Sequence, residues 1–234
     1  SVAMGLFFVG VLYFHLQQIM DQEARQRARL ILEQASSVQH YVQEELRPRM
    51  YAEKENREFI IEAMSSSYVS RKVMRDVAEH RDVIYRRVAV NSRNPDFEPK
   101  ELEMRMIRYF REHPRAGIWQ KELMRGDEQY FYCSRPVVFT ESCMRCHGDP
   151  QDAPDRIVEK YGAKRGFHYK TGEVAGVVSV GFPIQRTVNM IQGATLSYLS
   201  LYLAGIAAFF GVVQVFFHRL VTDKLKRLIE VMRQ

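Results

Sequence analysis

The sequence predicts an α+β domain built on a small antiparallel sheet and lying between two uncharged, apolar stretches. The apolar stretches are residues 1–14 and 196–217, which contain no Asp, Glu, Lys or Arg. Between them, segments with helical patterns come first, and segments rich in β-branched residues follow. Elements in this order, joined by short links, favour strands that pair with their neighbours and helices that pack on the resulting sheet.

The two apolar stretches predict transmembrane helices over residues 1–19 and 194–217. A helix rises about 1.5 Å per residue and needs about 20 apolar residues to cross the hydrocarbon core of a membrane. The alternative for the second stretch is a buried core helix. The alternative for the first stretch is a signal peptide, although no small-residue cleavage site follows it.

Basic residues predict the orientation of these helices. The second stretch is followed by His218, Arg219, Lys224, Lys226 and Arg227. Basic residues beside a span favour the cytoplasmic side, so we expect both ends in the cytoplasm and residues 20–190 in the periplasm, at the cytoplasmic (inner) membrane. Anionic lipid attracts part of the formal net charge of +6, and no nucleic acid partner is expected.

A long helix without glycine or proline is predicted over residues 20–46, and Pro48 is expected to end it. Apolar residues, most of them small, recur along this helix at spacings of three and four, and form a seam at Ala24, Ala28, Ile31, Ala35, Val38 and Val42. Such a seam either packs on its own domain or pairs with a second copy of the chain in a parallel homodimer.

The remaining elements follow from helical periodicity, β-branched runs and turn residues. A helix over residues 59–79 is expected to be interrupted or capped within residues 65–70. Shorter helices are predicted over residues 101–113 and 155–161. Strands are predicted over residues 83–90, 130–139 and 173–182.

The segment Cys143-Met144-Arg145-Cys146-His147 carries the strongest chemical signal in the sequence. Two cysteines separated by two residues can add to the two vinyl groups of one porphyrin, and the histidine that follows can ligate its iron. This spacing is therefore typical of c-type haem attachment. Such attachment takes place outside the cytoplasmic membrane, where the central segment is expected.

Zinc and a redox dithiol or disulfide are the alternatives. A zinc site needs four Cys or His ligands, which Cys133 and His168 would have to complete, and the sequence has no second Cys-x-x-Cys or His-x-His pair. A thioredoxin-like dithiol would open a helix after a strand, and the residues Gly148-Asp149-Pro150 are expected to break a helix there.

Short segments around the motif resemble a known family. They are Arg135-Pro136, Gly148-Asp149-Pro150, Ala153-Pro154, Tyr161-Gly162, Gly166-Phe167 and GEVAG at 172–176, together with RPRMY, AMSSSYVSRKVM and VAVNSRNP upstream. In order and spacing, the region of about residues 31–183 resembles a bacterial family of haem c-binding, PAS-like periplasmic sensor domains, formerly a domain of unknown function.

The resemblance implies a PAS-like domain with one covalently attached haem c, placed between two membrane helices and ahead of a HAMP linker. Residues 218–234 resemble the start of a HAMP helix, with apolar repeats at Leu225, Leu228 and Val231 or Met232, although Asp223 and Lys224 stand where a proline is usual. A kinase, cyclase or chemotaxis output would then follow Gln234. No catalytic base, nucleophile pair or phosphate loop stands out, so we expect no enzyme activity from this segment.

His147 is expected to be the proximal ligand of the haem iron. The resemblance implies a distal ligand from the long N-terminal helix, where His40 is the only histidine of the matched region. His40 faces the haem if the seam pairs with a partner helix, and it faces water if the seam packs on the domain core. The alternatives are His168, Cys133 and the methionines Met50, Met64 and Met74.

Basic side chains near the motif are expected to pair with the haem propionates, because guanidinium and ammonium groups suit carboxylates. The candidates are Arg135, Arg145 and Lys164, and solvated surface charge is the alternative for each. Cys133 shares a strand face with Phe131 and is expected to be a buried thiol. The remaining histidines have no motif around them and are expected to be structural: His15, His80, His113 and His218.

These features favour signal input as the function. A change in haem redox state, or the binding of NO, CO or O₂, would shift the membrane helices and the linker beyond them. A membrane-anchored c-type cytochrome for electron transfer is the alternative. A structural subunit with a vestigial haem is the third reading.

Overall fold

A computed structural model gives the fold of the chain and describes residues 2–53, 58–222, 224, 225 and 232. The chain divides into two units, one of residues 22–185 and the other of residues 1–21 together with residues 186–234. The unit of residues 22–185 is an α+β domain with one four-stranded antiparallel sheet, which confirms the predicted class.

The sheet has the strand order β1-β4-β3-β2, and every neighbouring pair is antiparallel. β1 (Ile84–Ala89), β3 (Glu128–Val138) and β4 (Val174–Pro183) are the three predicted strands. The sequence does not predict β2 (Trp119–Arg125), because WQKELMR contains no β-branched residue. β2 is a strand because it pairs with β3 across a turn at Gly126, whose φ of +63° favours glycine.

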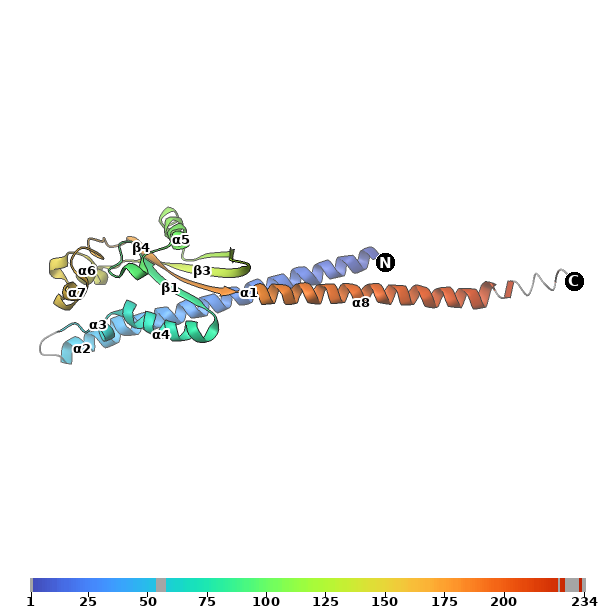
Figure 1. Cartoon of the computed structure of the whole chain (residues 1–234), viewed down its shortest axis with the longest axis horizontal. Coiled ribbons are helices and arrows are strands. Elements are labelled where there is room, and N and C mark those ends of the chain that lie inside the picture. The colour runs from blue at the N-terminus through green and yellow to red at the C-terminus, as the bar shows by residue number, and fades with distance from the viewer. Residues whose placement is uncertain (1, 54–57, 223, 226–231, 233–234) are drawn as a thin grey trace. The chain divides into compact units, whose positions relative to one another are not determined.

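α5 (Glu101–Glu112) covers one face of the sheet (Figure 1). Its apolar side is buried at Met106, Ile107 and Phe110, which share a core cluster with Val177 of β4. The predicted helix over residues 101–113 is therefore confirmed, and it fills the face that the cysteine–histidine motif does not use.

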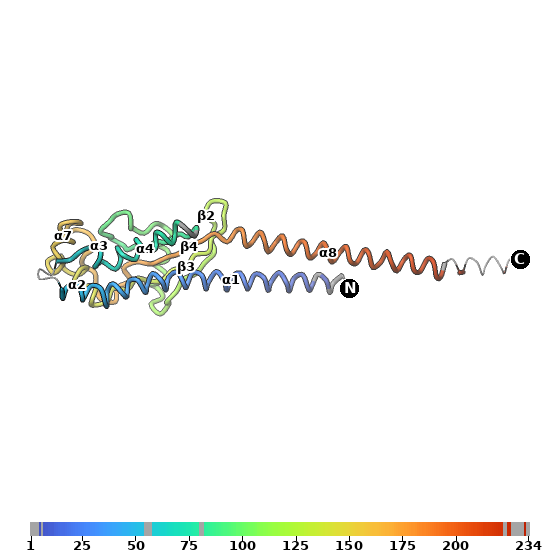
Figure 2. Tube along the Cα trace, turned by 90° about the horizontal axis from the view of Figure 1, so that it is seen from below, coloured from blue at the N-terminus to red at the C-terminus, as the bar shows by residue number. Residues whose placement is uncertain are grey.

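α1 (Val2–His40) contacts the other face of the sheet and also α4 (Ser66–Arg81), which runs beside it (Figure 2). The guanidinium of Arg27 lies 4.7 Å from the centre of the Phe182 ring in β4. Gln39 Nε2 donates a hydrogen bond to Ser70 Oγ of α4 at 3.2 Å. The stretch of α1 in this unit is thus held by both the sheet and a neighbouring helix.

The seam is buried inside this unit except at Val38, which is half-buried. Ala28 and Ala35 are only 0% and 1% exposed, and Ala24, Ile31 and Val42 are also buried. The seam therefore packs on the domain's own core, which is one of the two alternatives, and His40 is exposed to solvent. A homodimer stays a prediction, but this face of α1 no longer supports it.

The long helix continues through Pro48, and the expectation that Pro48 ends it is wrong. α1 passes into a π-helical turn over Tyr41–Leu46, in which the Arg47 N–H donates to the Val42 carbonyl, and the chain goes on as α2 (Arg47–Glu53). A proline lacks an N–H donor, and its ring crowds the carbonyl four residues earlier. In the wider π turn, backbone N–H groups donate to carbonyls five residues earlier and not four. This relieves the crowding just before the proline, so helical structure continues past it.

The predicted interruption within residues 65–70 is confirmed. Ser65 is extended between α3 (Ile61–Met64) and α4, and its Oγ accepts a hydrogen bond from the Tyr68 N–H. Ser65 is therefore the N-cap of α4, because its hydroxyl satisfies one of the free N–H groups of the first turn. This cap fixes where α4 begins, and with it which side of α4 faces the sheet.

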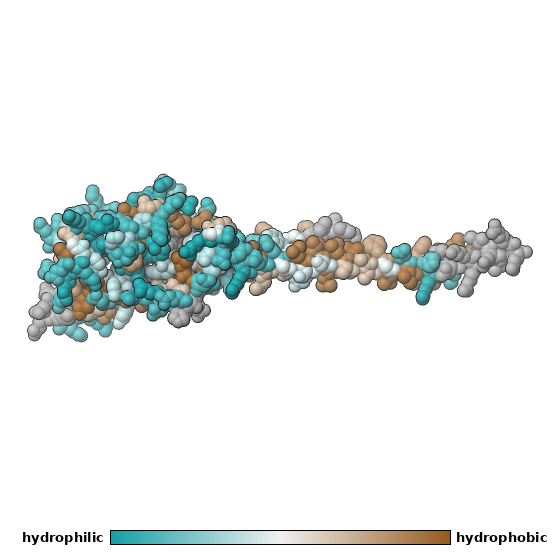
Figure 3. Space-filling view, viewed as in Figure 1, coloured by the Kyte–Doolittle hydropathy of each residue, from teal (hydrophilic) through white to brown (hydrophobic). Residues whose placement is uncertain are grey.

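The other unit contains the start of α1 and most of α8 (Gln185–Phe217). Among the described residues, one helix is long and apolar enough to cross a membrane, and it covers Gln185–Val221. Figure 3 shows apolar side chains gathered along it. Within this unit α1 and α8 meet at Gly5, where the Tyr202 ring fills the space that a larger side chain would need.

Several predicted features lie outside the described residues. They are the apolar repeats at Leu228 and Val231, the basic residues Lys226 and Arg227, Asp223 and the side chain of His80. Leu225 and Met232 are described and are exposed.

Replacing Ala28 by leucine is expected to lower the free energy of unfolding by about 1–3 kcal/mol, because a fully buried position has no room for added methyl groups. The matched control is Gln26→Leu, which adds the same side chain at an exposed position of α1. Denaturant unfolding of both variants measures the difference. Equal stabilities, together with stronger dimerisation of the Ala28→Leu variant, would contradict the packing of α1 on its own domain.

Candidate functional site

The cysteine–histidine motif lies in a short helix, α6 (Glu141–His147), that follows β3. An irregularity at Val137 and Val138 ends the regular pairing of β3 with β4, and such bulges bend a strand. Cys143 and Cys146 are three residues apart in α6, so they lie on the same side of the helix. Both are free thiols, and both line one cavity.

Residues 148–150 end the helix, as expected: α6 begins before the motif and stops at His147, with Gly148 as its C-cap. The motif therefore does not open a helix as a thioredoxin-like dithiol would, and the thiol chemistry gives a second argument against a redox dithiol. Burial raises the pKa of the Cys146 thiol, although three nearby arginines oppose that shift. A reactive dithiol requires a lowered thiol pKa, so the site does not favour a redox dithiol.

His147 is held in place by a hydrogen bond and by two aromatic rings. Its Nδ1 lies 2.9 Å from the Gly166 carbonyl oxygen. Its ring stacks on Phe139 with 4.7 Å between centroids, and Tyr169 meets it edge-on at 6.0 Å. Because a carbonyl can only accept, Nδ1 carries the proton and Nε2 keeps a free lone pair in the neutral ring.

Gly166 fits its place opposite His147 for two reasons. Its φ of +75° lies in the left-handed region that glycine adopts most easily. A Cβ at this position would also overlap the Arg93 side chain. The glycine therefore allows its carbonyl to meet His147 while Arg93 packs against the same loop.

Burial, with the positive charges of Arg93 and Arg87, lowers the pKa of His147 to about 4. The backbone hydrogen bond to Gly166 opposes this shift without reversing it. The imidazole is therefore neutral at neutral pH. A neutral imidazole whose Nδ1–H is fixed by a carbonyl is the form that binds a metal through Nε2.

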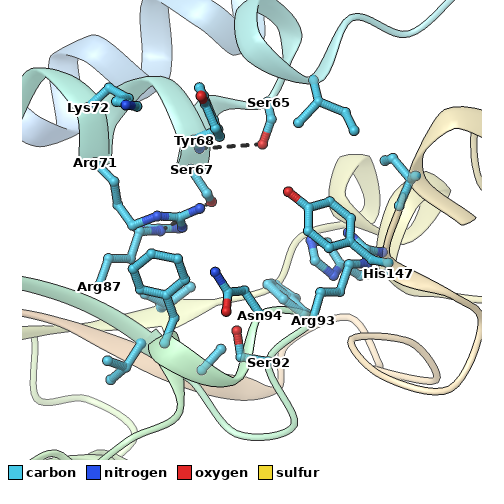
Figure 4. A pocket seen from close by; sticks show the side chains of 18 of the residues that line it. Ser65, Ser67, Tyr68, Arg71, Lys72, Arg87, Ser92, Arg93, Asn94 and His147 are labelled. Carbon is cyan, nitrogen blue, oxygen red and sulfur yellow. Dashed lines mark hydrogen bonds between the residues drawn. The ribbon is translucent and has the colours of Figure 1, made fainter. Parts of the chain in front are cut away.

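Two cavities of about 290 Å³ each share His147 in their linings. The first, here called the α4 cavity, lies between α4, β1 and the segment that follows β1 (Figure 4). The second, here called the thiol cavity, lies between α1 with its π turn, β3 and α6, and contains Cys143 and Cys146. Arg87 and Arg93 line both cavities.

Basic residues line both cavities, and no aspartate or glutamate is among the described residues that line them. The basic residues are Arg47, Arg71, Lys72, Arg75, Arg87, Arg93 and Arg135. Burial lowers the pKa of the guanidinium groups of Arg87 and Arg93. In the described part of the chain, no carboxylate lies within ion-pair distance of either, and Arg93 Nε is buried without a hydrogen-bond partner. Because an unpaired buried charge is unfavourable, the cavities suit an anionic ligand.

Of the three basic residues predicted to pair with the haem propionates, one lines the thiol cavity and two lie on the surface. Arg135 lines the thiol cavity and forms an ion pair with Glu33 at 3.3 Å. Arg145 is exposed, and its guanidinium lies 4.7 Å from the centre of the Tyr51 ring. Arg145 and Lys164 line neither cavity.

Arg87 and Arg93 are not among the residues that the sequence predicts for the site, yet theirs are the charges that lower the pKa of His147. Two signals could have indicated them. Arg87 is one of two arginines inside the β-branched run VIYRRVAV, where alternate residues face the protein interior. Arg93 lies in VAVNSRNP, one of the segments that carry the family resemblance.

The structure does not bring His40 to either cavity. α1 and its π turn present Ala35, Gln39 and Gln43 to the thiol cavity, whereas His40 is exposed. Met64 and Met74 are buried in the core, and Met50 packs against the core cluster that contains Met64. Among the described residues that line the cavities there is no second histidine and no methionine. The distal role of His40 stays a prediction.

The zinc alternative finds no support in the geometry. Within the described ranges, no group of three or more Cys, His, Asp or Glu side chains is placed to hold a metal ion. Cys133 is buried on the sheet, where Gln120 donates a hydrogen bond to its sulfur at 3.8 Å and burial raises its pKa. This is the buried thiol that the sequence predicts. His168 is exposed and lines neither cavity.

Comparisons with known proteins agree with this architecture. The chain is similar to the solved crystal structure of the cyanobacterial haem protein Tll0287, with a TM-score of 0.51 and 21% sequence identity, over 66% of this chain and 91% of that chain. No curated protein matches the chain. The sequence profile of the Tll0287-like family matches residues 17–183. Because this match covers well over half of the sequence, the chain belongs to the Tll0287-like family.

Proposed function

We propose that this chain binds one haem c through Cys143 and Cys146, with His147 as the proximal ligand of the iron. The observation that carries the proposal is that both thiols and a neutral imidazole line one cavity, in which every charged side chain among the described lining residues is basic. Haem carries two propionate carboxylates, which guanidinium groups bind well. The similarity of the fold to a haem protein supports the same reading.

The chemistry of attachment fits two free thiols. Each thiol adds across one vinyl group, so that a sulfur–carbon bond forms and the thiol proton goes to the other vinyl carbon. No oxidant is consumed in this addition. Bound haem supplies an iron that changes redox state and binds small ligands. The Gly166 carbonyl fixes the Nδ1–H of His147, and such an outer hydrogen bond orients a ligating histidine and raises its basicity.

The other side of the thiol cavity favours a sensor. Gln39 and Gln43 are presented there by α1 and its π turn, and their amides are weak ligands for haem iron. An iron whose second face has no strong protein ligand is open to NO, CO or O₂, and the polarity and access of that face decide between ligand binding and electron transfer. Electron transfer is the second candidate, and the partial exposure of Cys143 at the cavity edge favours it.

The proposal extends to a PAS-like sensor domain of a membrane receptor, with α8 and the start of α1 both spanning the membrane and residues 22–185 in the periplasm. The hydroxyls of Thr195, Ser197 and Ser200 each donate to the carbonyl four residues earlier in α8. Their hydrogen-bonding needs are thus met inside the helix, as lipid requires. Gly5 permits close approach of α1 and α8, and small residues play this part between membrane helices.

Signal output is proposed to pass through β4 and α8. Only Ile184 separates β4 from α8, and its N–H donates to the Gln129 carbonyl at 2.8 Å, so this junction is anchored to the sheet. A ligand-induced change on the cavity face of the sheet therefore has a short covalent route to α8. Beyond α8, residues 218–234 would act as a HAMP-like linker to an output domain, in a receptor that works as a homodimer.

Covalent haem is expected in protein produced together with a c-type haem attachment system. The chain should keep haem stain through denaturing electrophoresis and carry one haem per chain by haemochrome absorbance. The Cys143→Ser/Cys146→Ser variant should lose the stain, because no thioether can form. Cys133→Ser is the matched control and should keep it, because Cys133 is buried away from the cavity. Colourless wild-type protein that holds stoichiometric zinc would refute the proposal.

The His40→Ala substitution is expected to leave the ferric and ferrous haem spectra and CO binding unchanged, because His40 is exposed and lines neither cavity. His147→Ala should alter both measurements while the haem stays attached through its thioethers. If His40→Ala instead converts a low-spin iron into a high-spin, CO-reactive one, His40 is the distal ligand and the sequence-based prediction is right.

A further inference from the structure

One side of α4 lines the α4 cavity. The lining residues follow a helical spacing that places them on the same side: Ser67, Tyr68, Arg71, Lys72 and Arg75. Ser92 and Asn94 lie across from them, on the segment that follows β1 (Figure 4). Neither Cys143 nor Cys146 lines this cavity. The α4 cavity therefore has a polar and cationic lining of its own, apart from the residues that it shares with the thiol cavity.

Arg71 is the best placed of these cations to hold an anion. It is partly buried, and its guanidinium lies 4.0 Å from the centre of the Phe97 ring. Burial lowers its pKa, and the neighbouring charge of Arg87 lowers it further. No carboxylate of the residues that the structure describes lies within ion-pair distance of Arg71. A stacked guanidinium that lacks a counter-ion is preorganised to bind one.

The cavity also has apolar walls, which an inorganic anion would leave without contacts. Ile61, Phe97 and Phe139 line it together with the cations. A space of about 290 Å³ with this lining is at the small end of ligand pockets. A planar carboxylate matches the fork of a guanidinium, and an apolar body attached to it would cover the aromatic walls.

We propose that the α4 cavity is a second binding site, which takes a small organic carboxylate. Arg71 and Lys72 line only this cavity, whereas Arg87, Arg93 and His147 line both. A carboxylate bound here would therefore offset the positive charge of the shared arginines, and so change the electrostatic potential at His147. The proposal goes beyond the haem site and does not require that haem be bound.

Calorimetric titration of the full haem-loaded chain with benzoate tests the site, because benzoate joins one carboxylate to a small aromatic body. Arg71→Gln should weaken benzoate binding about tenfold or more, since it removes a charge-assisted pair of hydrogen bonds. The matched control is Arg108→Gln, which removes an exposed arginine from α5. It should leave the affinity unchanged. Circular dichroism checks that both variants are folded.

Titration of the Cys143→Ser/Cys146→Ser protein separates this proposal from the haem proposal. Benzoate binding to haem-loaded protein that Arg71→Gln weakens and Arg108→Gln does not supports the carboxylate site. If benzoate binds the Cys143→Ser/Cys146→Ser protein but not the haem-loaded protein, haem fills the α4 cavity. That result overturns the carboxylate proposal and leaves the haem proposal standing. Lack of binding to both proteins, insensitivity to Arg71→Gln, or equal affinity for sulfate would also overturn it. Failure of haem attachment is read separately, from haem stain.

Discussion

Positive charge is held inside the fold beside His147 by Arg87 and Arg93, and no carboxylate of the described chain pairs with either. Such charge is unfavourable unless an anion accompanies it. The same charges help to lower the pKa of His147, so the imidazole stays neutral with Nε2 free. One electrostatic constraint therefore supports both the proposed binding of a carboxylate-bearing cofactor and the proposed ligation of its iron by His147.

The fold places this charge through several elements that are distant in sequence. Arg87 lies in β1, and the Nε–H of Arg87 donates a hydrogen bond to Ser67 Oγ of α4 at 3.3 Å. Arg93 reaches back to the Cys146 carbonyl and lies 4.5 Å from the centre of the Phe167 ring, which ties the loop after β1 to α6. Burial of the α1 seam turns Gln39 and Gln43 toward the same space. The cavities thus depend on the packing of the whole unit of residues 22–185.

Local patterns made much of this structure predictable from sequence. Three strands, α5, α7 (Asp155–Tyr161) and the Ser65 cap follow from β-branched runs, helical periodicity and capping chemistry. β2 could not be predicted, because only its pairing with β3 makes it a strand. The direction of the seam, the π turn before Pro48 and the gathering of Arg87 and Arg93 around His147 arise from tertiary packing, which no local pattern contains. The motif and the two arginines each leave a local signal in the sequence, but only the fold shows that they meet at His147.

We propose that the half-buried cations Arg87 and Arg93 act on an iron bound by His147. The midpoint potential of the attached haem in wild-type and Arg87→Gln protein tests it most directly, with Arg108→Gln as a control for loss of an exposed arginine. A nearby buried positive charge favours the reduced iron, so its removal should lower the potential. We expect a lower potential for Arg87→Gln alone. An unchanged potential in folded, haem-loaded Arg87→Gln protein would contradict it.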